Sequence, residues 1–162
     1  MGLDIYLGVS GVSSHDSAAA LVIDGKVIAA VEEERFVREK NTGKFPFNSI
    51  EFCLDYAGIS SSQVDCVAYY FNPAERFLPT LKFNLSTDRT RYILEHGGNF
   101  EDLQKAHASA YRVEELILEG LLKTQDYTGK NFKNARFVPV NHHNAHAASA
   151  FYLSPFEEAS VL

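Results

Sequence analysis

Three histidines lie within five residues near the C-terminal end of the chain, at His142, His143 and His146. His142 and His146 are four residues apart, so on a helix they share one face and can bind a single metal ion. Imidazole suits iron, zinc, copper or nickel, and a pair of ligands needs a third from elsewhere. The alternative is a polar helix start in which the histidines cap a strand–helix turn. The pattern favours metal binding by His142 and His146, with His143 as a neighbour of the ligands or a substrate contact.

A second histidine stands beside a carboxylate near the N-terminus, at His15 and Asp16. A histidine next to an aspartate can act as an acid or a base, or can polarise a substrate carbonyl. The alternative is a turn in which Asp16 binds nearby backbone amides and His15 is merely exposed. We take His15 and Asp16 as candidate catalytic residues.

Residues 35–44 carry four cations, at Arg35, Arg38, Lys40 and Lys44. Such a group just past a strand can bind the oxygens of a phosphate or an acyl phosphate. The alternative is a solvated loop in which glutamates pair with the cations. We take Arg35 and Lys40 as candidate substrate-binding residues.

Three strands are predicted to open the chain, over residues 4–10, 17–23 and 26–32. Asp24-Gly25 separates the last two strands, and an Asp-Gly pair between apolar runs predicts an antiparallel hairpin with a type I′ turn. Residues 35–46 are predicted as a loop. The later elements are a helix over 47–57 with Asn48 and Glu51 at capping-box spacing, a buried strand over 64–71, a long helix from Asn99, a strand over 136–141, a helix over 143–152 and a strand beginning at residue 159.

This order predicts an α/β fold, with a mixed sheet of three initial antiparallel strands and flanking helices. It matches the ribonuclease H-like unit, which actin-like enzymes carry twice. Residues 1–158 are the expected first lobe, and residues 159–162 are the expected start of a truncated second lobe.

The composition limits the classes of function. The chain has 162 residues and a net charge of −6, which argues against a nucleic-acid-binding surface. No signal peptide or membrane span is visible, so we expect a cytoplasmic protein. Cys53 and Cys66 lie in apolar patterns and are predicted to be buried free thiols.

Four groups of motifs occur in order along the chain. They are Leu7-Gly8-Val9-Ser10 with His15-Asp16-Ser17-Ala18-Ala19-Ala20-Leu21; Glu33-Glu34-Arg35-Phe36 with Lys40 and Phe45-Pro46; His142-His143 through His146-Ala147-Ala148-Ser149-Ala150-Phe151; and Ser154-Pro155-Phe156-Glu157-Glu158-Ala159. Together they resemble the NodU/CmcH family of O-carbamoyltransferases. Residues 72–130 contain no matching motif.

The resemblance implies an actin-like catalytic domain related to the tRNA threonylcarbamoyl-transfer proteins. It implies a divalent metal, usually iron and alternatively zinc, bound by His142, His146 and an aspartate past Leu162. It also implies that His15 and Lys40 lie around the carbamoyl group and the phosphate. A separate domain, which this chain lacks, would make carbamoyl-adenylate from carbamoyl phosphate and ATP.

We therefore expect the parent protein to transfer a carbamoyl group to a hydroxyl of a small molecule, and the chain alone to be inactive. The expected partners are carbamoyl phosphate, ATP, the acceptor, the second lobe and the adenylate-forming domain. A homo-oligomer is a further expectation, because an incomplete unit exposes apolar surface. The alternatives are an actin-like sugar or carboxylate kinase lobe, and a non-catalytic structural lobe. Ser10 stands where such kinases carry the aspartate of their phosphate loop, which disfavours the kinase.

Overall fold

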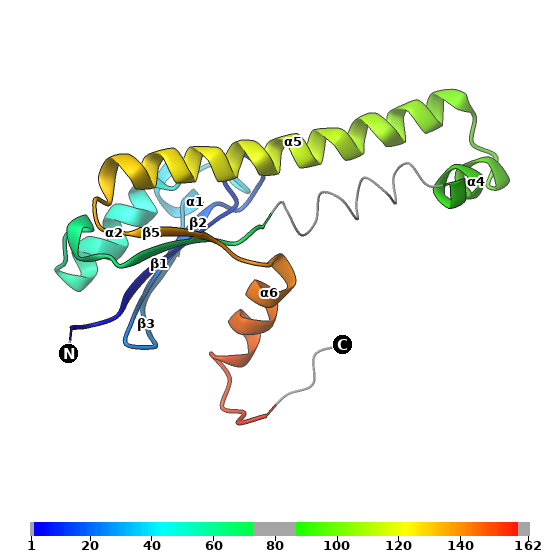
Figure 1. Cartoon of the computed structure of the whole chain (residues 1–162). Coiled ribbons are helices and arrows are strands. Elements are labelled where there is room, and N and C mark those ends of the chain that lie inside the picture. The colour runs from blue at the N-terminus through cyan, green and yellow to red at the C-terminus, as the bar shows by residue number, and fades with distance from the viewer. Residues whose placement is uncertain (1, 73–86, 159–162) are drawn as a thin grey trace.

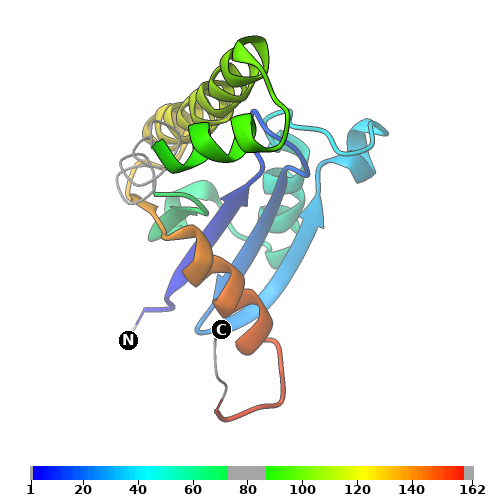
Figure 2. The ribbon, with the colours of Figure 1, turned by 90° about the vertical axis from the view of Figure 1, so that its right-hand side faces the viewer.

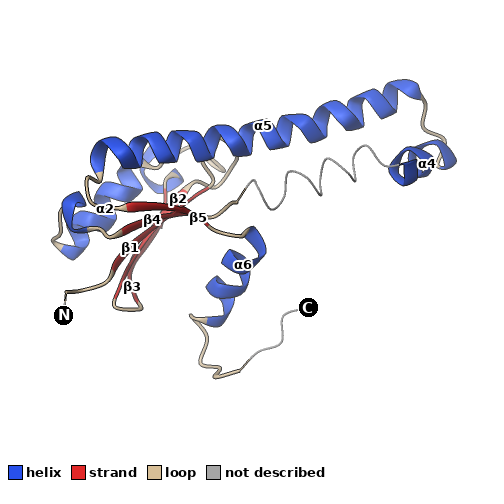
Figure 3. Cartoon of the chain, in the orientation of Figure 1, coloured by secondary structure: helices blue, strands red, loops and turns tan. Residues whose placement is uncertain are grey.

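A single mixed sheet forms the centre of the protein, with helices on both of its faces (Figure 1). The computed structural model describes residues 2–72 and 87–158. The strands, drawn red in Figure 3, are β1 (Ile5–Ser10), β2 (Ala18–Ile23), β3 (Lys26–Glu32), β4 (Cys66–Tyr69) and β5 (Arg136–Pro139). Their pairing gives the spatial order β3-β2-β1-β4-β5.

Strand direction changes across β1. β1 pairs antiparallel with β2, and β2 pairs antiparallel with β3. On its other side β1 pairs parallel with β4, which in turn pairs parallel with β5. The predicted α/β class and mixed sheet are confirmed. The opening strands do not form a wholly antiparallel sheet, because β1 takes a parallel partner.

The helices are α1 (Glu34–Val37), α2 (Phe47–Ala57), α4 (Thr87–Glu95), α5 (Phe100–Asn131) and α6 (His142–Phe151), with a short 3₁₀ turn at Ser61–Gln63. Figure 1 shows α2 and α5 over one face of the sheet, and Figure 2 shows α6 in front of the other. Among the helices that the structure describes, none has the length and apolar character needed to cross a bilayer. The strand predicted from residue 159 and the segment around Pro79 lie outside the described residues.

Side-chain size differs between the two faces of the sheet because side chains alternate along each strand. In β1 the residues Ile5, Leu7 and Val9 are buried toward α2 and α5, while Gly8 and Ser10 lie on the other face. The core gathers large apolar side chains around these three, including Leu21, Ile50, Val67, Tyr69 and Phe132. Beyond Tyr6, the face toward α6 presents small side chains, and a cavity lies along that part of it.

The hairpin and both cysteines agree with the sequence prediction. Asp24 and Gly25 have φ values of 48° and 74°, so both central residues adopt the positive φ that a type I′ turn needs. Cys53 and Cys66 are buried free thiols. Burial raises the pKa of the Cys53 thiol to about 11, so this sulfur stays protonated at neutral pH.

A buried glutamate caps α2. Glu33 is 1% exposed, and its carboxylate accepts hydrogen bonds from the backbone N–H and hydroxyl of Ser49, at 2.9 and 2.7 Å, and from Asn48. An ionised carboxylate at a helix N-terminus satisfies free N–H groups and interacts favourably with the helix dipole. The predicted capping box of Asn48 with Glu51 is wrong, since no local side chain caps α2. The predicted loop over 35–46 is also interrupted, by the single turn of α1.

Gly120 lets α5 approach the turn after β1. A Cβ atom at this position would overlap the carbonyl oxygen of Val12 and the hydroxyl of Tyr69. Gly129 lies nine residues later on the same helix, and a Cβ there would meet no atom within 4 Å. Substituting alanine at each glycine therefore distinguishes the effect of close packing on stability from the effect of helix propensity.

Gly120→Ala and Gly129→Ala are predicted to change stability in opposite directions. Alanine favours a helix by about 1 kcal/mol over glycine, so Gly129→Ala should raise the free energy of unfolding by about 0.5–1 kcal/mol. At Gly120 the overlap with backbone should outweigh this gain and lower stability by about 1–3 kcal/mol. Urea unfolding of both variants measures the two effects. A stabilising Gly120→Ala would show that α5 does not depend on this contact.

Candidate active site

The candidate residues gather at the edge of the sheet where the parallel strands end. β1, β4 and β5 run in the same direction, so their carboxyl ends lie at one edge. His15 and Asp16 follow β1, Tyr70 follows β4 and His142 follows β5. Ligands of open α/β sheets bind outside the carboxyl ends of the strands, which makes this edge the first place to look for a site.

The turn after β1 is tied to a second loop, residues 41–43. The N–H of Ser13 donates to the Gly43 carbonyl at 2.8 Å, and the N–H of Ser17 donates to the Thr42 carbonyl at 2.9 Å. A Cβ at Gly43 would lie 2.6 Å from the Ser14 carbonyl oxygen, so only glycine fits there. These contacts fix the backbone on both sides of His15.

The His15 imidazole is held by its neighbour. Its Nδ1 lies 2.8 Å from Oδ2 of Asp16, and the other oxygen of Asp16 accepts a hydrogen bond of 2.7 Å from the Asn41 amide. An ionised carboxylate only accepts hydrogen bonds, so Nδ1 carries the proton and Nε2 of the neutral ring is an acceptor. His15 is 76% exposed, which leaves Nε2 open to a substrate. This is the arrangement that a general base requires.

Hydrogen bonds also lower the pKa of Asp16. The bonds from His15 and then from Asn41 hold the pKa of the Asp16 carboxyl below its ordinary value of 3.8. A lowered pKa in the folded state means that these contacts stabilise the fold at pH values above the ordinary pKa. That stabilisation is lost as the pH falls through the folded-state pKa.

The imidazoles of His142 and His146 point at each other from the first turns of α6. Their Nε2 atoms are 3.0 Å apart, and their ring centroids are 4.4 Å apart. Asn141 caps the helix by accepting a hydrogen bond from the Asn144 N–H. The rings of Tyr70 and Phe71 pack on His142, with centroids 5.6 and 5.3 Å away. The predicted sharing of one helix face is therefore present.

Two nitrogens at this separation can bind one metal ion. Both fit at the roughly 2.0–2.1 Å that imidazole ligands of zinc adopt, on adjacent positions of the ion. Within residues 2–72 and 87–158 no third histidine, cysteine or carboxylate completes a group of ligands. The pair thus supplies two ligands, and a third would have to come from outside the described residues.

Tyr70 connects the two candidate groups. Its hydroxyl lies 3.3 Å from the hydroxyl of Ser14 in the β1–β2 turn, while its ring packs on His142. The turn that carries His15 and the histidines of α6 therefore border one edge of the sheet. Tyr70 was missed in the sequence, where it was only one more aromatic residue at the end of an apolar strand.

The remaining candidates are less closely associated. Arg35 is paired with Glu32 at 3.2 Å and with Glu34 at 3.6 Å. Lys44 pairs with Glu39. Lys40 is exposed and has no ion pair among the residues that the structure describes, but it adjoins Asn41, which binds Asp16. His143 is exposed beside His142, at a centroid distance of 5.7 Å. Of the four cations of residues 35–44, Arg35 and Lys44 are thus paired with glutamates.

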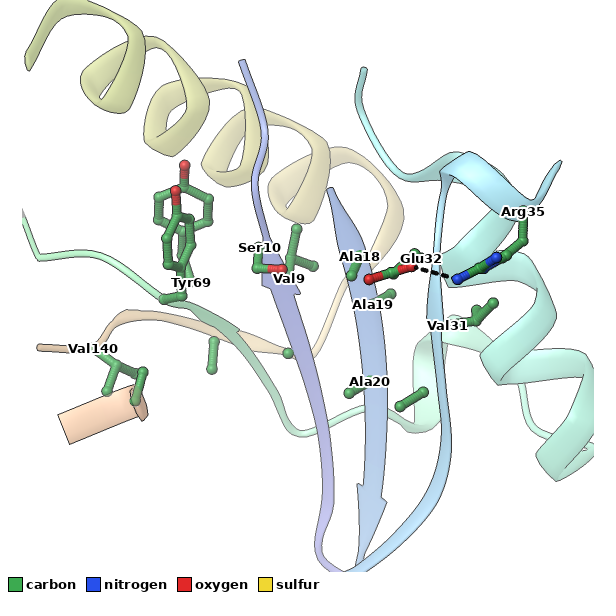
Figure 4. A pocket seen from close by; sticks show the side chains of 15 residues that line it. Val9, Ser10, Ala18, Ala19, Ala20, Val31, Glu32, Arg35, Tyr69 and Val140 are labelled. Carbon is green, nitrogen blue, oxygen red and sulfur yellow. Dashed lines mark hydrogen bonds and ion pairs between the residues drawn. The ribbon is translucent and has the colours of Figure 1, made fainter. Parts of the chain in front are cut away.

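A cavity of about 620 Å³ runs along the face of small side chains (Figure 4). Its walls include Ser10 at the end of β1, Tyr70, and Ala145 between the two histidines of α6. The Glu32–Arg35 ion pair, drawn as a dashed line in Figure 4, borders its far side. The volume suits a small molecule, and the cavity adjoins the edge where His142 and the β1–β2 turn lie.

The chain matches one family model and is similar to longer proteins. A family model described as "Carbamoyltransferase N-terminus" matches residues 6–162. The chain is 40% identical to Nodulation protein NolNO of Sinorhizobium fredii, over 91% of this chain and 19% of that protein. It is also 40% identical to an uncharacterized protein of Synechocystis, over 96% of this chain and 24% of that protein. The chain therefore spans a quarter or less of the length of these two relatives.

Asn41→Ala is predicted to raise the pKa of Asp16 toward its ordinary value. The variant removes one of the two hydrogen bonds that favour the ionised carboxylate. NMR titration of the Asp16 side-chain carboxyl carbon measures the change. Asn131→Ala is a matched control, because within the described part of the chain that amide donates to the Tyr127 carbonyl on α5 and not to Asp16. An unchanged pKa in Asn41→Ala would mean that Asn41 does not hold the carboxylate in solution.

Proposed function

The chain belongs to the carbamoyltransferase N-terminus family, and on this basis we propose that it is the N-terminal part of an enzyme that carbamoylates a small molecule. The donor is carbamoyl phosphate, activated with ATP as carbamoyl-adenylate, and the acceptor is a hydroxyl. The observation that carries this proposal is the match of the family model to residues 6–162. The downstream lobe and the adenylate-forming domain complete the proposed enzyme.

The proposed fold class is ribonuclease H-like, with residues 1–158 as the first lobe of an actin-like domain and residues 159–162 at the start of the second. Support comes from the strand order β3-β2-β1-β4-β5, with an antiparallel hairpin at one edge and parallel strands at the other. In this fold the cleft between the lobes faces the carboxyl ends of β1, β4 and β5.

His15 is the proposed catalytic base. Asp16 accepts a hydrogen bond from Nδ1 and so favours the tautomer in which Nε2 is an acceptor. The Asn41 amide donates to Asp16 and holds its carboxylate in position. Nε2 would accept the proton of the acceptor hydroxyl as its oxygen attacks the carbamoyl carbon. The bond from that carbon to the phosphate oxygen of the adenylate would break, and AMP would leave. Asp16 remains ionised and stabilises the imidazolium that forms, as the lowered pKa of its carboxyl allows.

His142 and His146 are the proposed ligands of a divalent metal, iron or zinc. Such an ion would supply Lewis-acid polarisation of the carbamoyl group. The separation of 3.0 Å between the two Nε2 atoms supports this assignment. The rings of Tyr70 and Phe71 pack against the His142 ring and limit its movement. His143, Arg35 and Lys40 are the proposed substrate contacts, and the cavity beside α6 is the proposed place for part of the substrate.

His15→Ala in the longer enzyme should abolish carbamoyl transfer while sparing adenylate formation. Loss of a general base costs about 10²–10⁴-fold in rate, so transfer should fall by at least about 10²-fold. The assay follows carbamoylated acceptor and, separately, ATP consumption dependent on carbamoyl phosphate. His96→Ala is the control, because His96 is exposed at the end of α4. Loss of both activities would contradict the role of His15, and ATP hydrolysis independent of carbamoyl phosphate would favour the kinase alternative.

Removing either helical histidine should remove the metal. His142→Ala and His146→Ala each delete one of two converging ligands, so metal content after purification should fall well below that of the unmodified longer protein. His143→Ala should keep its metal, because His143 lies outside the converging pair. Elemental analysis for iron and zinc makes this measurement without an activity assay. Equal metal content in all four proteins would contradict the assignment.

A further inference from the structure

The helix α5 brings a cation to the turn that carries His15. The Nζ atom of Lys123 donates a hydrogen bond of 3.1 Å to the hydroxyl of Ser13, which lies 110 residues earlier in the chain. Among the residues that the structure describes, no other lysine or arginine side chain bonds to the turn over residues 11–17. No motif in the sequence marks Lys123.

Two other lysines on α5 show what is particular to Lys123. Lys105, Lys123 and Lys130 each pair with a carboxylate four residues earlier on the helix, at 2.7, 2.5 and 2.6 Å. Lys105 and Lys130 are each 69% exposed, whereas Lys123 is 53% exposed. Counting contacts between described residues, Lys123 is the one of the three that reaches another element. All three lysines therefore make an i, i+4 ion pair within α5, and the contact with the β1–β2 turn distinguishes Lys123.

Close packing sets this contact. Gly120 lies one helical turn before Lys123 and lets α5 approach the Val12 carbonyl. This close approach fixes the position of α5 relative to the turn, so that Lys123 lies next to Ser13. Nζ has three protons, of which Glu119 and Ser13 take two. Among the residues that the structure describes the third proton has no acceptor, so a phosphate oxygen can take it.

We propose that Lys123 binds a phosphate oxygen of the substrate at this turn, while the Ser13 hydroxyl accepts from Lys123 and donates to Glu119. The proposal rests on the proposed carbamoyl transfer for the identity of the substrate, a carbamoyl phosphate or a nucleotide. Glu119 positions Lys123. Hydrogen bonding and charge from Lys123 lower the pKa of the Glu119 carboxyl, so Glu119 is ionised and competes with the phosphate for the ammonium group.

The test measures binding of inorganic phosphate, carbamoyl phosphate and ATP by calorimetry at low ionic strength. Lys123→Met should weaken phosphate binding about tenfold or more, because it removes a charge-assisted hydrogen bond. Lys130→Met is the matched control, with the same helical pair and no contact beyond α5 among the described residues, and it should bind as the unmodified protein does. Lys123→Arg should restore most of the affinity. If Lys123→Met weakens the binding of carbamoyl phosphate but not of ATP, the site binds carbamoyl phosphate. If it weakens the binding of ATP alone, the site binds the nucleotide.

A second variant separates binding from a merely structural tie. Glu119→Gln should tighten phosphate binding a few-fold, because it removes a competing negative charge. If Lys123 only braced the turn, Glu119→Gln and Lys123→Met would both weaken binding. That result would overturn the proposal, as would unchanged affinity in Lys123→Met or no phosphate binding by the unmodified protein. Urea unfolding of each variant confirms that the fold is intact.

The outcome for phosphate does not depend on carbamoyl transfer. If the protein binds phosphate through Lys123 but transfers no carbamoyl group, this site stands and the proposed function is refuted. If Lys123→Met leaves carbamoyl transfer unchanged, the proposed function stands and this site is refuted.

Discussion

Parallel pairing of β1 with β4, and of β4 with β5, is the constraint on which the arrangement of the candidate site depends. It aligns the carboxyl ends of three strands, which lie as far apart along the chain as Ser10 and Pro139. Each strand then delivers a different group to the same edge: His15 with Asp16, the aromatic ring of Tyr70, and the imidazoles of α6. A shift of one residue in the register of any of these strand pairs would turn the side chains of the shifted strand to the opposite face of the sheet.

The β1–β2 turn is held from several sides, which suits a site that must present a group accurately. Residues 41–43 bind its backbone, Tyr70 contacts the hydroxyl of Ser14, and α5 packs on it at Gly120. Glu33 contributes at a distance: its N–H donates to the Ser17 carbonyl, and its buried carboxylate caps α2. Catalytic groups gain most from such supporting contacts when the groups themselves are exposed, as His15 is.

Much of the fold was predictable because local patterns carried it. The Asp24-Gly25 hairpin, the helix ending at Gly58, the helix beginning at Asn99 and the buried cysteines all follow from turn chemistry, capping and apolar periodicity. The capping box proposed for α2 failed because the actual cap is Glu33, fourteen residues before Phe47. Capping motifs in a sequence are sought among neighbouring residues, so a cap that comes from a distant residue through a tertiary contact is missed.

The sequence by itself determined the chemical types present: a histidine beside an aspartate, two histidines one helical turn apart, and small residues alternating with large ones in the first strands. It also determined the family, since motifs near both ends of the chain occur in a characteristic order. Only the tertiary structure decided which of these groups meet. Lys123 and Tyr70 could not be found from the sequence, because an i, i+4 ion pair or an aromatic residue after a strand looks the same wherever it lies. Their contacts with the β1–β2 turn exist because strand pairing and the close approach at Gly120 bring distant segments together.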